Sequence, residues 1–108
     1  KFSVSFPEYR DKMLEMGEKY DLPVLDLGRA TADYLNTVGD EGSKKLFMWL
    51  EKGAYEGYPD GKKDNAHLQQ AGAKAFAGLL AGLLRSYERD DKLDKVKAEL
   101  SQNMFVAL

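Results

Sequence analysis

The sequence predicts an α/β protein that is rich in helix. A short apolar run of β-favouring residues, Leu22-Pro23-Val24-Leu25-Asp26-Leu27-Gly28, directly follows an amphipathic helical pattern, as a buried parallel strand does in an α/β sheet. A longer helical pattern begins just after His67. The length of 108 residues suits a single domain with a modest core.

The composition argues against several functional classes. The net charge is −2 and no block of lysine or arginine stands out, so we expect no nucleic-acid partner. The chain has no cysteine and one histidine, which leaves a zinc site few possible ligands; we expect neither a metal nor a cofactor. No apolar run approaches the ~20 residues that a membrane-spanning helix needs, so we expect no membrane partner.

The first helix is predicted at residues 7–20. Ser5 is the expected N-cap, with Pro7 in the first turn and Glu8 three residues after the cap. Before it, apolar and polar residues alternate as in a short strand or an extended arm. One apolar stripe follows the helix and is interpreted as a packing face; its members are Tyr9, Met13, Met16 and Tyr20.

A strand is predicted at residues 22–27, with Val24, Leu25 and Leu27 buried. Pro23 stands at its start, where a strand tolerates proline. Asp26 is unusual inside an apolar strand. It either pins a neighbouring loop through hydrogen bonds, which we favour, or takes part in catalysis.

Residues 29–50 predict a helix, a break at residues 39–42, and a second helix that Ser43 caps. A loop at residues 51–63 follows, and Tyr58-Pro59-Asp60-Gly61 is a strong turn signal within it. Three aromatic residues could stack on a sugar ring or could merely cover the edge of the core: Trp49, Tyr55 and Tyr58.

The only histidine, His67, is the expected centre of any chemistry. Histidine titrates near neutral pH and is the usual general base, and Asp64, three residues earlier, could face it on a turn that enters a helix. The longest helix is predicted at residues 68–88, and its glycines indicate close packing. The sequence predicts no role for the charged tail at residues 89–108.

A single strand cannot form a parallel sheet, so we expect its partner strands to lie outside these 108 residues. Asp64-Asn65-Ala66-His67-Leu68, followed by Gly72-Ala73, resembles the D-x-x-H block near the C-terminus of SGNH (GDSL-type) hydrolases. The upstream blocks Leu22-Pro23-Val24-Leu25-Asp26-Leu27, Lys45-Leu46-Phe47-Met48 and Tyr58-Pro59-Asp60-Gly61 occur in the matching order. Together they are similar to the C-terminal part of rhamnogalacturonan acetylesterases and related carbohydrate esterases, over roughly the first ninety residues.

The resemblance implies part of a flavodoxin-like, three-layer α/β/α fold and a Ser-His-Asp esterase. His67 would deprotonate the serine and Asp64 would orient His67. The family's serine lies in an N-terminal Gly-Asp-Ser block, which is absent here along with the oxyanion residues. Residues 1–108 would then be the C-terminal portion of one SGNH domain. They would be inactive alone and would need the N-terminal part of that domain as partner.

The resemblance also implies a substrate and a setting. The complete protein would be a serine esterase acting on an acetylated polysaccharide or oligosaccharide, secreted or periplasmic, and possible as a homo-oligomer. Two alternatives remain open. One is a non-catalytic interaction domain in which Asp64 only caps a helix. The other is a carbohydrate-binding module in which Trp49, Tyr55 and Tyr58 form the stacking platform.

Overall fold

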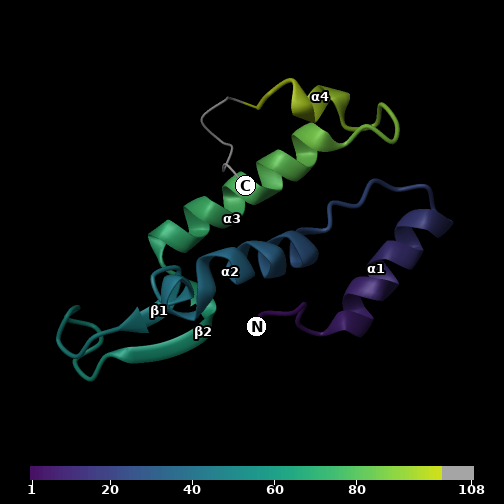
Figure 1. The fold of residues 1–108 in the computed structure, drawn as a ribbon. Helices are drawn as coiled ribbons and strands as arrows, with labels where there is room; N and C mark the ends of the chain where they lie inside the picture. The colour runs from purple at the N-terminus through teal and green to yellow at the C-terminus, as the bar shows by residue number, and fades with distance from the viewer. Residues whose placement is uncertain (101–108) are drawn as a thin grey trace.

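A computed structural model describes residues 1–100, so residues 101–108 of the predicted tail lie outside the described part. Four helices and two strands follow in the order α1 (Pro7–Lys19), α2 (Leu27–Ser43), β1 (Phe47–Leu50), β2 (Lys62–Leu68), α3 (Gln70–Ser86) and α4 (Asp94–Lys97) (Figure 1). The strands pair antiparallel in one two-stranded sheet. The helix-rich content and the small sheet agree with the α/β class in its coarse form. Within residues 1–100, no helix has the length and apolar character needed to cross a membrane.

The core lies between α2 and α3, which pack side by side (Figure 1). It is small, and Leu79 of α3 is its most deeply buried large side chain; the buried hydrophobic residues are Ala32, Leu35, Leu46, Leu79, Ala81 and Leu84. Phe47 at the start of β1 meets Phe76 of α3 edge to face, with ring centroids 6.0 Å apart. These contacts fix the base of the hairpin on α3, while its far end projects from the body (Figure 1).

The predicted strand at residues 22–27 is wrong. Residues 22–26 are extended but pair with no strand among residues 1–100, and Leu27 already begins α2. An extended segment with no neighbouring strand does not form the backbone hydrogen bonds of a sheet. Val24 and Leu25, expected to be buried, are consequently only half-buried, and so is Leu27.

The predicted second helix after the break is also wrong, because Phe47–Leu50 is strand β1. Gly39 breaks the helical geometry with a φ of 76°, and α2 ends at Ser43. Ser43 does not cap a following helix; it is buried and its hydroxyl donates to the Asp40 carbonyl at 2.6 Å. The aromatic residues that follow favour a strand once β2 offers them a partner.

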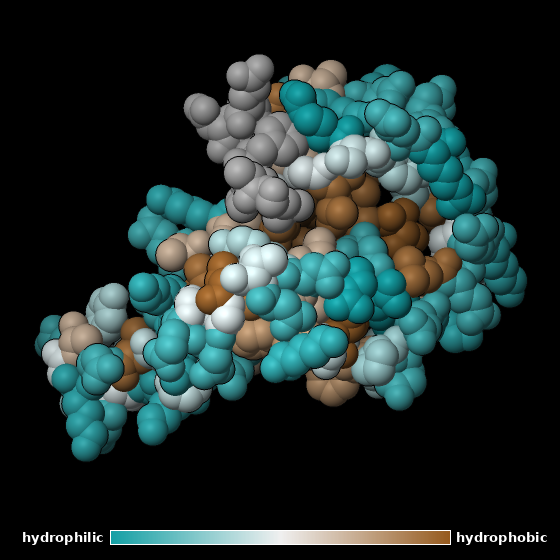
Figure 2. Space-filling view, viewed as in Figure 1, coloured by the Kyte–Doolittle hydropathy of each residue, from teal (hydrophilic) through white to brown (hydrophobic). Residues whose placement is uncertain are grey.

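Helix α1 forms where it was predicted, but three of the four residues of its apolar stripe are exposed. Tyr9 and Met13 are 74% and 64% exposed, and Tyr20 is also exposed. The side of the helix that carries Gly17 faces the body, and Gly17 lies directly against Val24. Apolar surface gathers in a hollow between α1 and the α2–α3 pair (Figure 2). The radius of gyration, 16.4 Å, exceeds the ~13 Å of a compact 100-residue domain.

The two ends of α1 are held differently. At its start, Phe6 occupies the cap position in a left-handed conformation, and Ser5 makes no capping bond. Past its end, Lys92 of the tail forms an ion pair with Asp21 at 2.7 Å. Arg89 lies 3.6 Å from the same carboxylate. The part of the tail that the structure describes therefore secures the C-terminal end of α1.

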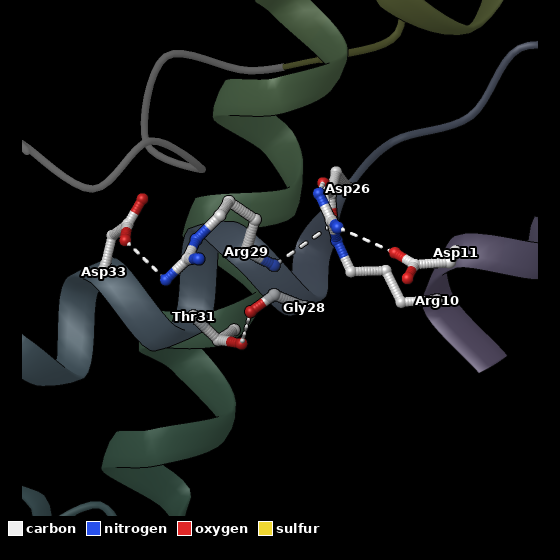
Figure 3. Close-up of polar contacts among 7 residues, drawn as sticks. All are labelled: Arg10, Asp11, Asp26, Gly28, Arg29, Thr31 and Asp33. Atoms are coloured by element: carbon white, nitrogen blue, oxygen red, sulfur yellow. Dashed lines mark hydrogen bonds and ion pairs between the residues drawn. The ribbon is translucent and has the colours of Figure 1, made fainter. Parts of the chain in front are cut away.

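Asp26 makes the principal attachment (Figure 3). The Arg10 guanidinium of α1 binds both carboxylate oxygens, with its Nε 3.0 Å from each. Asp26 is also the N-cap of α2, where its Oδ1 accepts from the Arg29 N–H at 3.1 Å. The bond from Arg10 is the main reason that the pKa of Asp26 lies below its usual range. Asp26 thus has the structural hydrogen-bonding role that was favoured, but it holds two helices together and does not pin a neighbouring loop.

Replacing Asp26 by Asn keeps a good N-cap but removes the charge that Arg10 binds. We expect the free energy of unfolding at pH 7 to fall by about 1 kcal/mol, since the pair is partly exposed. Because folding lowers the pKa of the Asp26 carboxyl, this group stabilises the fold at pH values above its pKa in the unfolded chain. The stabilisation disappears as the pH falls through its pKa in the folded protein. Urea unfolding at pH 7 and pH 3 should therefore show a smaller acid-induced loss in Asp26→Asn than in the unmodified chain. The exposed Asp33→Asn is the control; an equal acid-induced loss in Asp26→Asn would contradict the account.

Candidate functional site

The Asp64-Asn65-Ala66-His67 stretch lies in strand β2, where it interrupts the pairing of the sheet. Phe47 pairs with Leu68 and Trp49 pairs with Lys63, so a single residue of β1 faces four residues of β2. Residues 64–67 therefore bulge out of the ladder. The sequence placed them on a turn that enters a helix at residue 68, whereas they belong to β2 and α3 begins at Gln70.

The base of the bulge is locked to the start of α3. The Gln69 backbone N–H donates to the Leu46 carbonyl at 2.7 Å, and its side-chain amide donates to the carbonyls of Phe47 at 2.6 Å and Lys44 at 3.2 Å. Gly72 lies so close to the Leu46 carbonyl that a Cβ would collide with it. Gln69 thus makes no capping bond to the helix; it fixes where the bulge ends.

Asp64 uses its two carboxylate oxygens for different partners. Oδ1 accepts from the backbone N–H groups of Ala66 and His67 at 2.6 and 2.8 Å, which closes a tight turn. Oδ2 lies 2.8 Å from Nδ1 of the His67 ring. The backbone N–H of His67, then that of Ala66, then the ring contact hold the pKa of Asp64 well below its usual range. The carboxylate is ionised at neutral pH and can only accept.

His67 is oriented by this contact while remaining accessible. Because the facing carboxylate can only accept, Nδ1 carries the hydrogen in the bond to Asp64, and the neutral ring keeps its lone pair on Nε2. The His67 side chain is 76% exposed, whereas that of Asp64 is 15% exposed. An exposed imidazole with a free Nε2 and a fixed Nδ1–H has the form that a general base requires.

The contact between Asp64 and the δ nitrogen of His67 matches the arrangement expected from the sequence. A nucleophile beside it is not found among residues 1–100. No serine hydroxyl in this part of the chain hydrogen-bonds to His67, and the buried Ser43 is engaged with Asp40. The same residues hold no group of three or more histidine and carboxylate side chains that could bind a metal ion.

The three candidate sugar-binding aromatics do not come together. Trp49 lines a cavity of about 840 Å³, whereas Tyr55 and Tyr58 line a different cavity of about 440 Å³. The turn at residues 58–61 forms as predicted, with the Gly61 N–H donating to the Tyr58 carbonyl at 3.0 Å. It leaves Tyr55 55% exposed and Tyr58 36% exposed.

Two further residues link these aromatics to the pair. Lys62 Nζ lies 5.2 Å from the centroid of the Tyr58 ring and 3.6 Å from Asp64 Oδ2. Asn65 accepts from the Trp49 indole N–H at 2.6 Å. Sequence reasoning missed both because it placed Lys62 in a loop and Asn65 on a turn that enters a helix. A strand would have placed Lys62 and Asp64 on one face by their spacing of two residues.

Comparison with known proteins relates the chain to an esterase over part of its length. Seventy-four residues, 68% of this chain, are 39% identical to the rhamnogalacturonan acetylesterase RhgT of Bacillus subtilis (strain 168). The matched region is 32% of that protein, so this chain spans about a third of its length. No protein-family model matches the chain, and no solved structure matches it. The sequence is therefore similar to a portion of a carbohydrate acetylesterase.

Proposed function

We propose that this chain supplies the histidine and aspartate of a Ser-His-Asp carbohydrate acetylesterase of the SGNH type. The 2.8 Å contact between Asp64 Oδ2 and His67 Nδ1, within a bulge that leaves the ring exposed, is the observation that carries the proposal. The similarity to a rhamnogalacturonan acetylesterase supports the reaction class. The serine and the oxyanion donors come from another part of the same domain.

The proposed reaction assigns each atom of the pair a role. His67 Nε2 takes the proton of the serine hydroxyl as the serine oxygen attacks the ester carbonyl. The ionised Asp64 stabilises the imidazolium that forms, and the imidazolium then gives the proton to the departing sugar oxygen. Water next attacks the acetyl-enzyme by the same proton transfers and releases acetate. This chain alone has no esterase activity.

The proposed substrate is an acetylated polysaccharide or oligosaccharide. A sugar presents C–H faces that pack on aromatic rings, and Tyr55 and Tyr58 line a shared cavity. Leu68 and Gln69, the two residues that follow His67, also line this cavity, so it lies close to the pair. Tyr55 and Tyr58 would hold the sugar that carries the acetyl group.

A purely structural role for Asp64 is the second candidate, and one observation favours it. Asp64 Oδ1 already satisfies the two N–H groups of Ala66 and His67, as a turn residue does without any catalysis. In that case the chain would be a non-catalytic interaction or carbohydrate-binding domain. The tautomer of His67 separates the two roles, because the turn needs only Oδ1.

We expect the neutral His67 ring to carry its proton on Nδ1, since Asp64 Oδ2 accepts from that atom. In Asp64→Asn the side chain can keep the oxygen that closes the turn, but it turns an amide N–H₂ towards the ring. The proton should then move to Nε2. Long-range ¹H–¹⁵N NMR spectra above pH 8 distinguish the two tautomers. An Nε2-protonated ring in the unmodified chain would contradict the catalytic orientation and favour the structural role.

Joined to an N-terminal segment that supplies the Gly-Asp-Ser block, the chain should hydrolyse acetyl esters. His67→Ala should lower kcat by about 10⁶-fold, and Asp64→Asn by about 10⁴-fold. Asp60→Asn, a change of the same chemistry in the exposed loop, should leave kcat unchanged. Acetate release measured on all four proteins tests this. Activity that survives His67→Ala would show that another group is the base.

Tyr58→Ala should weaken hydrolysis of an acetylated polysaccharide about tenfold, the equivalent of ~1.4 kcal/mol of lost contact. Hydrolysis of a small aryl acetate should hardly change, because this substrate has no sugar to pack on the ring. Tyr9→Ala on α1, a more exposed tyrosine far from Tyr58 in the sequence, should affect neither substrate. Equal losses on both substrates would mean that Tyr58 supports the fold and does not contact the sugar.

A further inference from the structure

Lys62 contacts the carboxylate oxygen through which Asp64 acts on the histidine. Its ammonium nitrogen lies 3.6 Å from Asp64 Oδ2, and the same Oδ2 lies 2.8 Å from Nδ1 of the His67 ring. These two contacts are the ion pairs that Asp64 forms within residues 1–100. The proposed reaction gives a role to Asp64 and to His67, but none to this third charged group.

The hairpin determines where the ammonium lies. Lys62 begins β2 opposite Leu50 of β1, and Gly61 before it lies so close to the Leu50 carbonyl that a Cβ would collide with it. The alternation of side chains along a strand then directs Lys62 and Asp64 to the same face. The Tyr58 ring, whose centroid is 5.2 Å from Nζ, gives the ammonium a second contact. The charge of Lys62 is therefore held beside Oδ2.

Few other charges face the pair. Within residues 1–100, the His67 ring forms its ion pair with Asp64 alone. Strand β1, Phe47–Leu50, contains no charged residue, and the first charged residue of α3, Lys74, lines a cavity with later residues of that helix. Lys63 is exposed and alternates to the opposite face of β2 from Asp64. The hairpin loop carries the remaining nearby charges, all exposed and none in an ion pair with Asp64 or His67: Glu51, Lys52, Glu56 and Asp60.

A cation beside Oδ2 changes what the carboxylate does to the ring. The negative charge of Asp64 favours the imidazolium form of His67, and the positive charge of Lys62 opposes it. The side chains of Lys62 and Asp64 are 35% and 15% exposed, so water screens their charges only in part. The ammonium thus offsets part of the attraction between the carboxylate and a protonated ring. The neutral ring is the form that accepts a proton from a serine.

We propose that Lys62 is a positioning residue of the Asp64–His67 pair, which holds Asp64 Oδ2 in place and keeps His67 neutral at a lower pH than Asp64 alone would allow. The inference deepens the proposed function and rests on it for one point, that His67 is the base of ester hydrolysis. Lys62 acts through the carboxylate and contacts neither the serine nor the ester.

The pH profile of kcat/KM tests the inference in the chain joined to the segment that supplies the serine, with a small aryl acetate as substrate. In Lys62→Gln the acid limb should move to higher pH by about half a unit, the effect of one partly exposed charge, which is about a threefold change in the neutral fraction of the ring on that limb. Above this limb kcat/KM should change little. Lys62→Arg keeps the charge and should restore the profile. Lys63→Gln removes the same charge from the opposite face of β2 and should leave the limb in place.

The chain alone gives a second readout that needs no ester hydrolysis. His67 is its only histidine, so NMR can follow the titration of this ring against pH without overlap. Lys62→Gln should raise the midpoint of the titration by about half a pH unit, whereas Lys62→Arg and Lys63→Gln should leave it in place. The Nδ1–H tautomer at high pH should be the same in every variant, which checks that the Asp64 turn is kept.

Three results in the chain alone would overturn the inference: an unmoved midpoint in Lys62→Gln, a midpoint that moves to lower pH, or an equal shift in Lys63→Gln. A midpoint that depends on Lys62, in a chain whose joined form is inactive, would support the effect of Lys62 on the ring and contradict the esterase proposal. An active joined protein whose acid limb ignores Lys62→Gln would overturn the inference and leave the esterase proposal intact.

Discussion

The pairing of β1 with β2 cannot run continuously, because one residue of β1 must face four of β2 between Phe47 and Trp49. The candidate site depends on this mismatch. In a regular strand, Asp64 and His67 would be three residues apart and would point to opposite faces of the sheet. The bulge folds the chain back, Asp64 Oδ1 closes the turn, and Oδ2 is then directed at the ring. Gln69 and the close approach of Gly72 to Leu46 keep the excess residues in this position.

The rest of the fold supports the hairpin, but its hydrophobic core is small. Burial concentrates between α2 and α3, where Leu79 is the most enclosed large side chain, and the hairpin is attached at its base. Helix α1 relies on polar contacts instead, chiefly the hydrogen bonds that the Arg10 guanidinium donates to both carboxylate oxygens of Asp26. Three of the four residues of its aromatic and methionine stripe, Tyr9, Met13 and Tyr20, remain exposed, so the side that sequence periodicity marks as a packing face buries little within residues 1–100.

Local sequence signals predicted the features that depend on local physics. The helical periods of α1 and α3, the Tyr58-Pro59-Asp60-Gly61 turn and the approach of Asp64 to His67 all arise within a few residues. The errors lie where a segment's structure depends on a distant partner. Residues 22–26 are apolar and β-favouring, yet no strand within residues 1–100 lies beside them. Phe47–Leu50 fits a helix or a strand by pattern, and only β2 decides. The bulge depends on the register between β1 and β2, which neither segment encodes alone. The contacts of Lys62, Asn65 and Gln69 depend on the same register.

The central claim is that Asp64 acts through His67, and a double-mutant cycle measures this most directly. Ester hydrolysis would be compared among the unmodified protein, Asp64→Asn, His67→Ala and the double variant, each joined to the segment that supplies the serine. If the two residues form one unit, Asp64→Asn should cause a large loss when His67 is present and almost none when it is absent. The same loss in both backgrounds would contradict the account, since Asp64 would then act on the turn alone.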